Sequence, residues 1–399
     1  MKAVVIGPGL IGCGFAGQVL HDSGYEVVFA ARNPAMVDYF NRARGYRVRL
    51  VDGQETRELV VEGVRAVFTG EPDHAAEEIS TADLIITAVG ANNLPNVASL
   101  IAAGLERRSV PVNVLAFENL INAGPYLRHL VAGFLPRDYS LATHGFSGTL
   151  VDRAVPQRLG DPAADELLIF LGEPQSTFVV DGSRLQEPLP IIAGMIVARD
   201  YTAWIRRKLY LFSAGHATCA YLGYLKGYHY IHTAIRDPEI RAAVLAAMTE
   251  GQCGLAARYG SEVAGNESDL QMILARFENP ALNDPIVRVG RDPQRKLGAE
   301  DRLVGAARLA EAAGIRPEKL ALAVAAALCF YNPEDPSATE LHDEIDAAGL
   351  GPALRHICGL DPNSGLGHFV TEFWRQLASG CWQKSNLLLS LEKLLWAWR

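Results

Sequence analysis

The chain has 399 residues, of which 49% are hydrophobic and 21% are charged, and its formal net charge at pH 7 is −8. This composition is typical of a folded globular protein, and the length exceeds a single core of ordinary size, so two domains are expected. The acidic balance argues against nucleic acid and anionic membranes as partners, but it leaves room for an anionic substrate where cations gather locally.

Nothing in the sequence predicts membrane insertion, export or metal binding. The longest apolar run, residues 321–331, is too short to span a bilayer, and the first expected strand leaves no room for a signal peptide. The six cysteines include no Cys-x-x-Cys pair, and His229 and His232 lack a third ligand at suitable spacing. We therefore expect a cytoplasmic protein with neither a disulfide framework nor a metal site.

The first strand and helix predict a dinucleotide site. Residues 2–6 form a short apolar strand that runs directly into Gly7-Pro8-Gly9-Leu10-Ile11-Gly12. Glycines at this spacing allow a tight turn, a close approach of the backbone to a pyrophosphate, and close packing of helix on strand. A helix over 15–22, whose N-terminus would face the phosphates, and a second strand over 26–30 follow. We expect the cofactor to contact Gly7, Gly9, Leu10, Ile11 and Gly12.

The end of the second strand indicates which dinucleotide is bound. NAD-binding proteins of this kind place an acidic residue about 20 positions after the glycines, where it binds the ribose hydroxyls. Here the stretch reads Ala30-Ala31-Arg32-Asn33, without a carboxylate. Arg32 can pair with a 2′-phosphate, so the sequence predicts NADP, with NAD as the alternative, and contacts from Ala31, Arg32 and Asn33. The competing interpretation is an exposed arginine without a role in cofactor binding.

Two further buried strands are predicted at residues 83–89 and 112–117, with a helix over 93–105 between them. Because the carboxyl ends of parallel strands open onto the cofactor crevice, we expect contacts from the residues that follow them, which are Thr87, Ala88, Val89, Glu118 and Asn119. The Asn119 amide can hold the nicotinamide, the substrate or a catalytic lysine. An asparagine at a strand end is, however, more often a turn residue.

Strand patterns largely vanish after about residue 190. Long helical patterns follow at residues 201–222, 238–259, 268–277, 301–313, 317–330 and 367–378. The expected fold class is therefore α/β, with an N-terminal Rossmann dinucleotide-binding domain over residues 1–190. A mostly α-helical C-terminal domain over residues 191–399 would supply substrate-binding and catalytic groups.

One predicted helical face carries groups suited to proton transfer. Residues 208–216 read Lys-Leu-Tyr-Leu-Phe-Ser-Ala-Gly-His. At about 100° per residue, Ser213 and His216 lie roughly 140° and 80° around the axis from Lys208, so all three can line one pocket. A lysine desolvated beside a histidine can have a pKa near neutrality and accept a proton from an alcohol as a hydride leaves the same carbon. The alternative is an amphipathic helix with a snorkelling lysine and a core histidine.

A cationic stretch lies downstream, formed by Arg288, Arg291, Arg295, Lys296 and Arg302. Arginine forks bind phosphate or carboxylate bidentately, so this stretch predicts a substrate-binding anion clamp, with a solvated loop as the alternative. Asp152 and Arg153 are expected to form a buried structural ion pair that joins the domains.

The ordered motifs resemble those of the polyol-specific long-chain dehydrogenases of the mannitol dehydrogenase family. They comprise the glycine-rich start, Thr87-Ala88-Val89-Gly90, Glu118-Asn119, Val151-Asp152-Arg153-x-Val155-Pro156, Arg207-Lys208-Leu209, Gly215-His216-Ala217, Ala220-Tyr221-Leu222-Gly223, Arg276-Phe277-Glu278-Asn279-Pro280, Arg288-Val289-x-Arg291, Arg295-Lys296-Leu297 and Asp301-Arg302-Leu303. The resemblance covers roughly residues 1–360. It implies a metal-independent dehydrogenase in which Lys208 is the general base, His216 orients substrate oxygens and Asn119 helps to position the reacting group.

Two positions depart from the family pattern. Where the family has an asparagine between the lysine and the histidine, this chain carries Ser213. A serine hydroxyl is shorter and donates only one hydrogen bond, and loss of one oxyanion donor costs about 100-fold to 1000-fold in turnover. Either the enzyme tolerates this loss, or its substrate is not the usual one. The other departure is Ala31-Arg32, where NAD-dependent relatives carry an acidic residue.

The resulting hypothesis is an NAD(P)-dependent oxidoreductase that interconverts a sugar alcohol, or its phosphate, and the keto sugar in a cleft between the domains. Two alternatives stay open. One is a reductase of an altered substrate such as a sugar-derived imine, an opine or a hexuronate, and the other is a catalytically weak nucleotide-binding sensor. We expect a monomer or homodimer without a nucleic-acid or membrane partner. The segment after residue 380 is expected to cap the core or to make a dimer contact.

Overall fold

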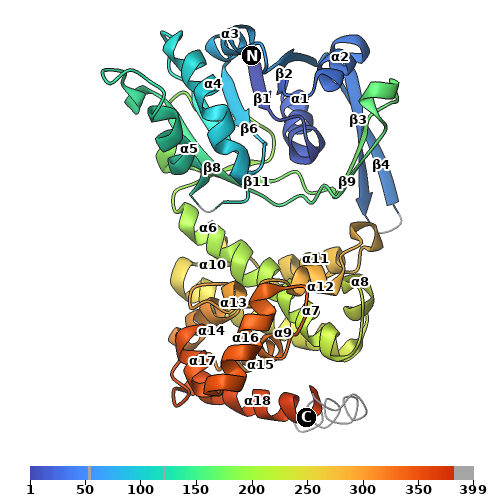
Figure 1. Cartoon of the computed structure of the whole chain (residues 1–399), viewed down its shortest axis with the longest axis vertical. Helices are drawn as coiled ribbons and strands as arrows, with labels where there is room; N and C mark the ends of the chain where they lie inside the picture. Colours follow the sequence, from blue (N-terminus) through green and yellow to red (C-terminus); the bar gives the residue numbers. More distant parts are fainter. Residues whose placement is uncertain (53–54, 121, 382–399) are drawn as a thin grey trace. The chain divides into compact units, whose positions relative to one another are not determined.

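The computed structural model describes residues 1–52, 55–120 and 122–381 (Figure 1). The chain divides into two compact units, Met1–Trp204 and Ile205–Arg399, and each has its own hydrophobic core. The segment from Trp382 onward, for which a capping or dimer contact is expected, lies outside the described residues.

Among the described residues, eight strands of the first unit form a sheet in the order β12-β11-β8-β7-β6-β1-β2-β5. Their bounds are β1 Lys2–Ile6, β2 Glu26–Ala31, β5 Arg65–Phe68, β6 Leu84–Thr87, β7 Asn113–Ala116, β8 Gly145–Val151, β11 Phe178–Asp181 and β12 Met195–Ala198. The run from β5 to β8 is parallel throughout and has the strand order of a doubly wound dinucleotide-binding fold. The predicted α/β class is confirmed.

Helices cover both faces of this sheet. They are the π-helix η1 Gly12–Gly17 with α1 Gln18–Asp22, then α2 Pro34–Ala43, α3 Pro72–Ser80, α4 Leu94–Glu106 and α5 Ala123–Ala132. Along β1, Ala3 and Val5 face the core that contains η1 and α2, while Val4 and Ile6 face the core that contains α3, α4 and α5. Strands buried on both faces have this continuous apolar character, which is why β1 and β6 can be recognised in the sequence.

The sequence does not predict the second, four-stranded sheet, which has the order β4-β3-β10-β9. Its strands are β3 Gly45–Asp52, β4 Glu55–Glu62, β9 Gln157–Leu159 and β10 Ile169–Gly172. Most of β4 is exposed, and Glu58 on β4 pairs with Arg47 and Arg49 on β3 at 2.9 and 2.6 Å. These ion pairs lie on the exposed side of the sheet. On β3, Tyr46, Val48 and Leu50 are buried and alternate with charged residues, a strand pattern that the sequence-based prediction missed. A second difference is β12, which lies beyond residue 190, where strands were not expected.

The second unit is helical. Its elements are α6 Tyr201–Lys208, which begins in the first unit, η6 Leu209–Ser213, α7 Ala214–Leu225, α8 Ile231–Ala234, α9 Pro238–Tyr259, α10 Ser261–Ala264, α11 Glu267–Phe277, α12 Ile286–Gly290, α13 Pro293–Lys296, α14 Val304–Ala312, α15 Glu318–Leu328, α16 Pro336–Ala348, α17 Leu350–His356 and α18 Gly365–Cys381. Every residue of α15 from Leu320 to Leu328 is buried, so this helix is central to the core.

Short 3₁₀ turns connect several of these elements, at η2 Ala91–Asn93, η3 Leu141–Thr143, η4 Pro162–Ala164, η5 Gly182–Arg184 and η7 Pro280–Leu282. Within the described ranges, no helix combines the length and the apolar character that crossing a bilayer requires.

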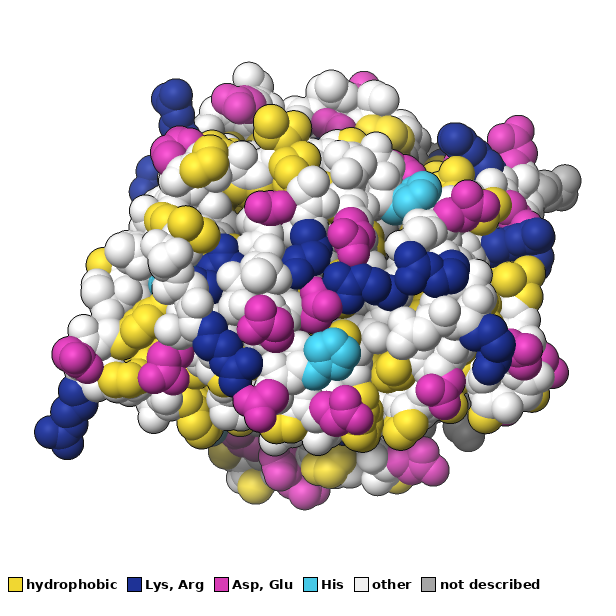
Figure 2. Space-filling view, turned by 90° about the horizontal axis from the view of Figure 1, so that it is seen from above, with side chains coloured by type: hydrophobic (Ala, Val, Ile, Leu, Met, Phe, Trp, Pro, Cys, Tyr) yellow, Lys and Arg dark blue, Asp and Glu magenta, His cyan; other side chains and the backbone are white. Residues whose placement is uncertain are grey.

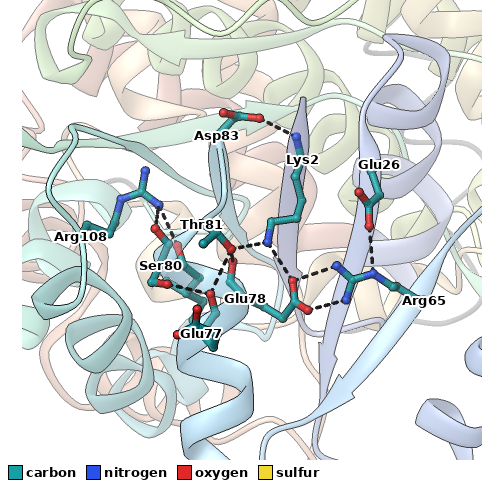
Figure 3. A network of polar contacts seen from close by, with 10 residues as sticks. Lys2, Glu26, Arg65, Glu77, Glu78, Ser80, Thr81, Asp83 and Arg108 are labelled. Carbon is teal, nitrogen blue, oxygen red and sulfur yellow. Dashed lines mark hydrogen bonds and ion pairs between the residues drawn. The ribbon is translucent and has the colours of Figure 1, made fainter.

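A polar network joins the amino ends of the parallel strands (Figure 3). Glu78, at the end of α3, accepts hydrogen bonds from Lys2 Nζ at 2.9 Å and from both terminal nitrogens of Arg65 at 2.6 and 2.9 Å. Arg65 also donates to Glu26 at 2.9 Å. The Arg65 hydrogen bonds, with Lys2 assisting, lower the pKa of Glu78 to about 2. The face at this end of the first unit shows basic and acidic side chains interspersed (Figure 2).

This network generates a stability prediction. Since the pKa of Glu78 is lowered by folding, its stabilising contribution is complete above the ordinary glutamate pKa and is lost as the pH falls toward 2. Glu78→Gln should therefore reduce the free energy of opening of β1 by about 1 to 3 kcal/mol at pH 7, and by less at pH 3. Hydrogen exchange of the peptide that contains β1, measured at both pH values, checks this.

The matched control is Asp73→Asn, which breaks the exposed Arg107–Asp73 pair and should change the opening free energy by less than about 0.5 kcal/mol. A loss in Glu78→Gln that is equal at pH 7 and pH 3 would show that packing, not charge, accounts for it.

Candidate functional site

The glycine-rich turn in the first unit forms an open cradle. Gly7 follows β1 with a φ of +99°, and a Cβ there would lie 2.7 Å from the carbonyl oxygen of Ala88. A Cβ on Gly12 would lie 2.0 Å from the carbonyl oxygen of Gly7. At Gly9, by contrast, a Cβ would meet nothing within 4 Å. Gly7 and Gly12 are thus required by the fold, whereas Gly9 borders open space that a pyrophosphate can approach.

The helix after this turn begins at Leu10, which is exposed, and passes through η1 into α1. Its first backbone N–H groups, from Leu10 to Gly12, lie at a helix N-terminus, a position that favours anions. The buried Arg153 guanidinium supports η1 by donating to the Gly14 carbonyl at 3.0 Å and to Gln18 Oε1 at 2.7 Å. These contacts lie within the first unit, where Arg153 packs helix on sheet, and the expected role of Asp152 and Arg153 in joining the domains stays a prediction.

The structure separates the three residues predicted to select the cofactor. Ala31 is buried at the end of β2, while Arg32 and Asn33 are exposed. The Asn33 side chain accepts a hydrogen bond from the backbone N–H of Ala35 at 3.0 Å and caps the N-terminus of α2. Of the three, Arg32 has the exposed charge that a 2′-phosphate would need.

The carboxyl ends of β6 and β7 come together as the sequence predicts. Ala88 N–H donates to the Ile6 carbonyl at 2.9 Å, and Val89 N–H donates to Glu118 Oε1 at 3.0 Å. Glu118 is buried, and burial raises the pKa of its carboxyl group against the opposing effect of the backbone N–H groups of Val89 and Gly90. Glu118 thus links the two strand ends beside Gly7, next to the buried Thr87, while Asn119 is exposed.

In the second unit, a π turn occupies the segment that carries the candidate catalytic residues. Lys208 ends α6, the turn η6 runs to Ser213, and Ala214 N–H donates to the carbonyl of Leu209, five residues back. Because an i→i+5 turn has more residues per turn than an α-helix, the angle between Lys208 and Ser213 is smaller than the roughly 140° expected for a regular helix. Single π turns occur frequently at functional sites.

His216 lies in an aromatic and charged environment. Its ring stacks on Phe277 at a centroid distance of 5.0 Å and 12°, and Nε2 lies 3.3 Å from Asp284 Oδ2. Burial, followed by the charges of Arg288, Arg302, Arg276 and Lys296, lowers the pKa of His216 to about 3. The imidazole is therefore neutral at physiological pH, and its contact with Asp284 joins a carboxylate to an uncharged ring.

Aromatic packing holds the π turn itself. The Arg276 guanidinium lies 4.3 Å from the ring centroid of Phe212, and Phe277 lies 5.2 Å from the same ring on another side. Phe212 belongs to η6, so α11 fixes the turn through these two contacts. Sequence reasoning did not single out Arg276 or Asp284 as site residues. Only their tertiary positions reveal them, because neither belongs to the 208–216 segment.

The residues of the predicted cationic clamp differ in their burial and in their ion-pair partners. Arg288 pairs with Asp284, and Arg291 is exposed at the end of α12. Arg295 instead pairs with Asp292 at 2.5 Å and with Asp301 at 3.7 Å. Lys296 is buried and donates to the carbonyls of Val289 and Arg291.

Burial, followed by Arg302 and Arg295, lowers the pKa of Lys296 to about 7. The Lys296 amino group therefore satisfies backbone carbonyls at the C-terminal end of α12. Arg288, Arg291 and Arg295 are the exposed cations of this stretch, and both Arg288 and Arg295 are paired with carboxylates.

A cavity of about 580 Å³ also lies in the second unit, lined by Tyr224, Gly227, Tyr228, His229, Tyr230, Pro285, Ile286 and Val287. Within residues 1–52, 55–120 and 122–381, no group of three or more His, Cys, Asp or Glu side chains is arranged to hold a metal ion.

Both halves of the chain match described protein families. Residues 1–194 match the Rossmann domain of mannitol dehydrogenases, and residues 200–354 match the mannitol dehydrogenase C-terminal domain. A protein of Brevibacillus brevis named mannitol-1-phosphate 5-dehydrogenase is 40% identical over 384 residues, covering 94% of this chain and 98% of its own length. A Bacillus subtilis protein of the same name is 37% identical over 373 residues, covering 92% of this chain and 97% of its own.

Two solved structures share the fold. A D-sorbitol dehydrogenase in its substrate-free form is 17% identical with a TM-score of 0.79, and the match covers 95% of this chain and 93% of that one. A mannitol 2-dehydrogenase of Pseudomonas fluorescens in a ternary complex with NAD and D-mannitol is 18% identical with a TM-score of 0.68, covering 99% and 94%. The resemblance drawn from the sequence motifs is confirmed.

The glycine-rich cradle yields a paired prediction. Gly9→Ala should leave the melting temperature unchanged but weaken NAD(P)H binding by about 10-fold or more, because its Cβ would enter the space that the pyrophosphate approaches. Gly12→Ala should lower both stability and affinity, because its Cβ would collide with the Gly7 carbonyl.

Thermal melts and fluorescence titration with reduced cofactor measure both effects. Gly351→Ala, where the nearest atom to a Cβ is 3.6 Å away, is the control. Unchanged cofactor affinity in Gly9→Ala would place the pyrophosphate elsewhere.

Proposed function

Because this chain belongs to the mannitol dehydrogenase family, it is an oxidoreductase with a nicotinamide cofactor, and we propose that it interconverts a polyol phosphate, such as mannitol 1-phosphate, and the keto sugar phosphate. The observation that carries the proposal is the match over 98% of a relative named mannitol-1-phosphate 5-dehydrogenase. The intact Lys208 and His216 on either side of the π turn support an active enzyme over a sensor.

The cradle of the first unit fits a dinucleotide. Gly7 and Gly12 shape the turn, and open space borders Gly9, where N–H groups at the start of a helix can meet a pyrophosphate. Thr87, Ala88, Val89 and Glu118 would lie toward the nicotinamide end, at the carboxyl edge of the sheet. A bound nicotinamide supplies the hydride acceptor for oxidation and the hydride donor for reduction.

Lys208 is proposed as the general base. In the oxidising direction its neutral amine accepts the hydroxyl proton while the hydride leaves the same carbon, and in the reducing direction its ammonium returns that proton to the carbonyl oxygen. Proton transfer by an amine needs no Lewis acid, so the proposal includes metal independence, and activity should survive treatment with EDTA. His216 and the exposed Asn119 would orient substrate oxygens, as the family resemblance implies.

The substrate's phosphate would be held by exposed arginines of the second unit. Arg288 and Arg291 flank the end of α12, and the charges of Arg276 and Arg302 also reach His216. This gathering of cations in an acidic chain favours an anionic substrate. Ser213 in place of the family asparagine favours the second candidate, a reductase of a related imine, opine or hexuronate.

The proposed cofactor preference is NADP over NAD. Arg32 is exposed where β2 leads into α2, and the buried Ala31 provides no carboxylate to repel a 2′-phosphate. The N-terminus of α2, which follows at Pro34, adds a favourable field for an anion.

The base is tested by Lys208→Ala, which should lower kcat for mannitol 1-phosphate oxidation by at least about 1000-fold while the Kd for reduced cofactor stays within about 2-fold. Lys208→Arg is the matched variant, because a guanidinium keeps the charge but does not release a proton at neutral pH, so it should be equally inactive. The same assay with unphosphorylated mannitol and sorbitol, and with hexuronates in the reducing direction, identifies the substrate. Turnover near that of the wild type in either variant would overturn the assignment.

The cofactor preference is tested by titrating both reduced cofactors. NADPH should bind more tightly than NADH by about 1 to 3 kcal/mol, the range for charge-assisted hydrogen bonds. Arg32→Ala should weaken NADPH binding by about 10-fold or more and leave NADH nearly unchanged, and Ala31→Asp with Arg32→Val should reverse the preference. Arg128→Ala, an exposed arginine on α5, is the control. Tighter binding of NADH to the wild type would show that Arg32 points away from the ribose.

A further inference from the structure

The contact between His216 and Asp284 determines which ring nitrogen carries a proton. A neutral imidazole has one N–H donor and one nitrogen lone pair, and an ionised carboxylate has only acceptors. Asp284 Oδ2 lies 3.3 Å from Nε2 of His216. Two acceptors at this distance would repel each other, so the geometry favours the tautomer with its hydrogen on Nε2.

Asp284 is itself fixed from two sides. Its backbone carbonyl accepts a hydrogen bond from Ile231 N–H at 3.0 Å, which ties the loop to the start of α8. Its second carboxylate oxygen pairs with Arg288, one turn further along the chain. The side chain is 18% exposed, so it has lost much of its hydration, and the Arg288 guanidinium balances its charge.

The His216 ring is equally constrained. It stacks on Phe277 at 12°, and Phe212 lies 5.6 Å away at a tilt. With the ring stacked on Phe277 and Nε2 placed 3.3 Å from Asp284 Oδ2, the position of Nδ1 follows from the geometry of the ring. The side chain is 17% exposed, which leaves part of the ring accessible.

We infer that Asp284 is a positioning residue that holds His216 as its Nε2–H tautomer and so presents Nδ1 as a hydrogen-bond acceptor to a substrate hydroxyl. The inference rests on the proposed function in assigning that hydroxyl to a polyol. His216 then recognises a hydroxyl group that donates, and Ser213 is left as the neutral donor on the same side of the helix. Asp284 acts through His216 and does not itself touch the substrate.

The tautomer can be observed directly in the full chain labelled with ¹⁵N-histidine. Two-bond ¹H–¹⁵N correlation spectra distinguish the protonated from the unprotonated ring nitrogen, and His216→Gln identifies the His216 signal. The wild type should show the Nε2–H form without any substrate. Asp284→Asn introduces an amide that can donate to Nε2, so the Nδ1–H form should become populated.

Kinetics supply the second readout. Asp284→Asn should lower kcat/KM for the polyol by about 10-fold to 100-fold while the Kd for cofactor is unchanged, because the acceptor facing the substrate is lost. Asp284→Glu restores a carboxylate and should recover the Nε2–H form and part of the activity. A purely structural role would lower stability without changing the tautomer.

Glu344→Gln is the matched control, because Glu344 also faces a histidine, with its Oε1 at 3.0 Å from His356 Nδ1. It should change the His356 signal and leave that of His216 and kcat/KM unaltered.

An Nδ1–H tautomer in the wild type overturns the inference even if Asp284→Asn fails to fold, and so does wild-type kcat/KM in a folded Asp284→Asn. If the wild type oxidises no polyol, the proposed function fails, whereas the NMR spectrum still decides the tautomer.

Discussion

The i→i+5 turn between Leu209 and Ala214 is the constraint on which the second unit's candidate site depends. In a regular helix Lys208 and Ser213 would point in clearly different directions, whereas the π turn returns Ser213 to the lysine side before α7 begins. Such a turn is rare and weakens the helical ladder, so it persists only where the surroundings support it. Here Arg276 and Phe277 of α11 enclose Phe212 and supply that support.

The first unit also contains a π turn that is supported by side chains from distant segments. Its π turn η1 follows the glycine-rich cradle, and side chains from distant segments bind the carbonyls that the turn leaves poorly placed. Tyr46 donates to the Cys13 carbonyl at 2.9 Å, and Arg153 donates to the Gly14 carbonyl at 3.0 Å. Each candidate binding segment is therefore an irregular helix whose shape depends on tertiary contacts, and substitutions at Tyr46 or Arg276 act on the site without touching a ligand.

The sequence predicts what depends on local pattern and fails where structure depends on distant partners. The apolar strand β1, the glycine turn and the helix at 238–259 match the structure at their bounds, because a continuous apolar run marks the doubly buried strand and Pro238 and Gly260 mark the helix ends. β3 has the alternating pattern of a half-buried strand, but its partner β10 lies more than a hundred residues away, so the sequence does not show that the two strands share a sheet. The same difference applies to the residues of the candidate site. Contiguous motifs reveal Gly7 and Lys208, but no pattern shows that Asp284 reaches His216 or that Lys296 is buried.

In the proposed site, burial and charge together would allow a neutral histidine to lie beside the anionic substrate that we propose. Burial, with the surrounding cations assisting, keeps the pKa of His216 low, and Asp284 shares its carboxylate between Arg288 and the ring. A protonated histidine would attract a phosphate in competition with the arginines and would lose its lone pair for a hydroxyl. Under the proposed function, the cations that would favour an anion also help to preserve the acceptor for a polyol hydroxyl, so binding strength and hydroxyl recognition would depend on one electrostatic arrangement.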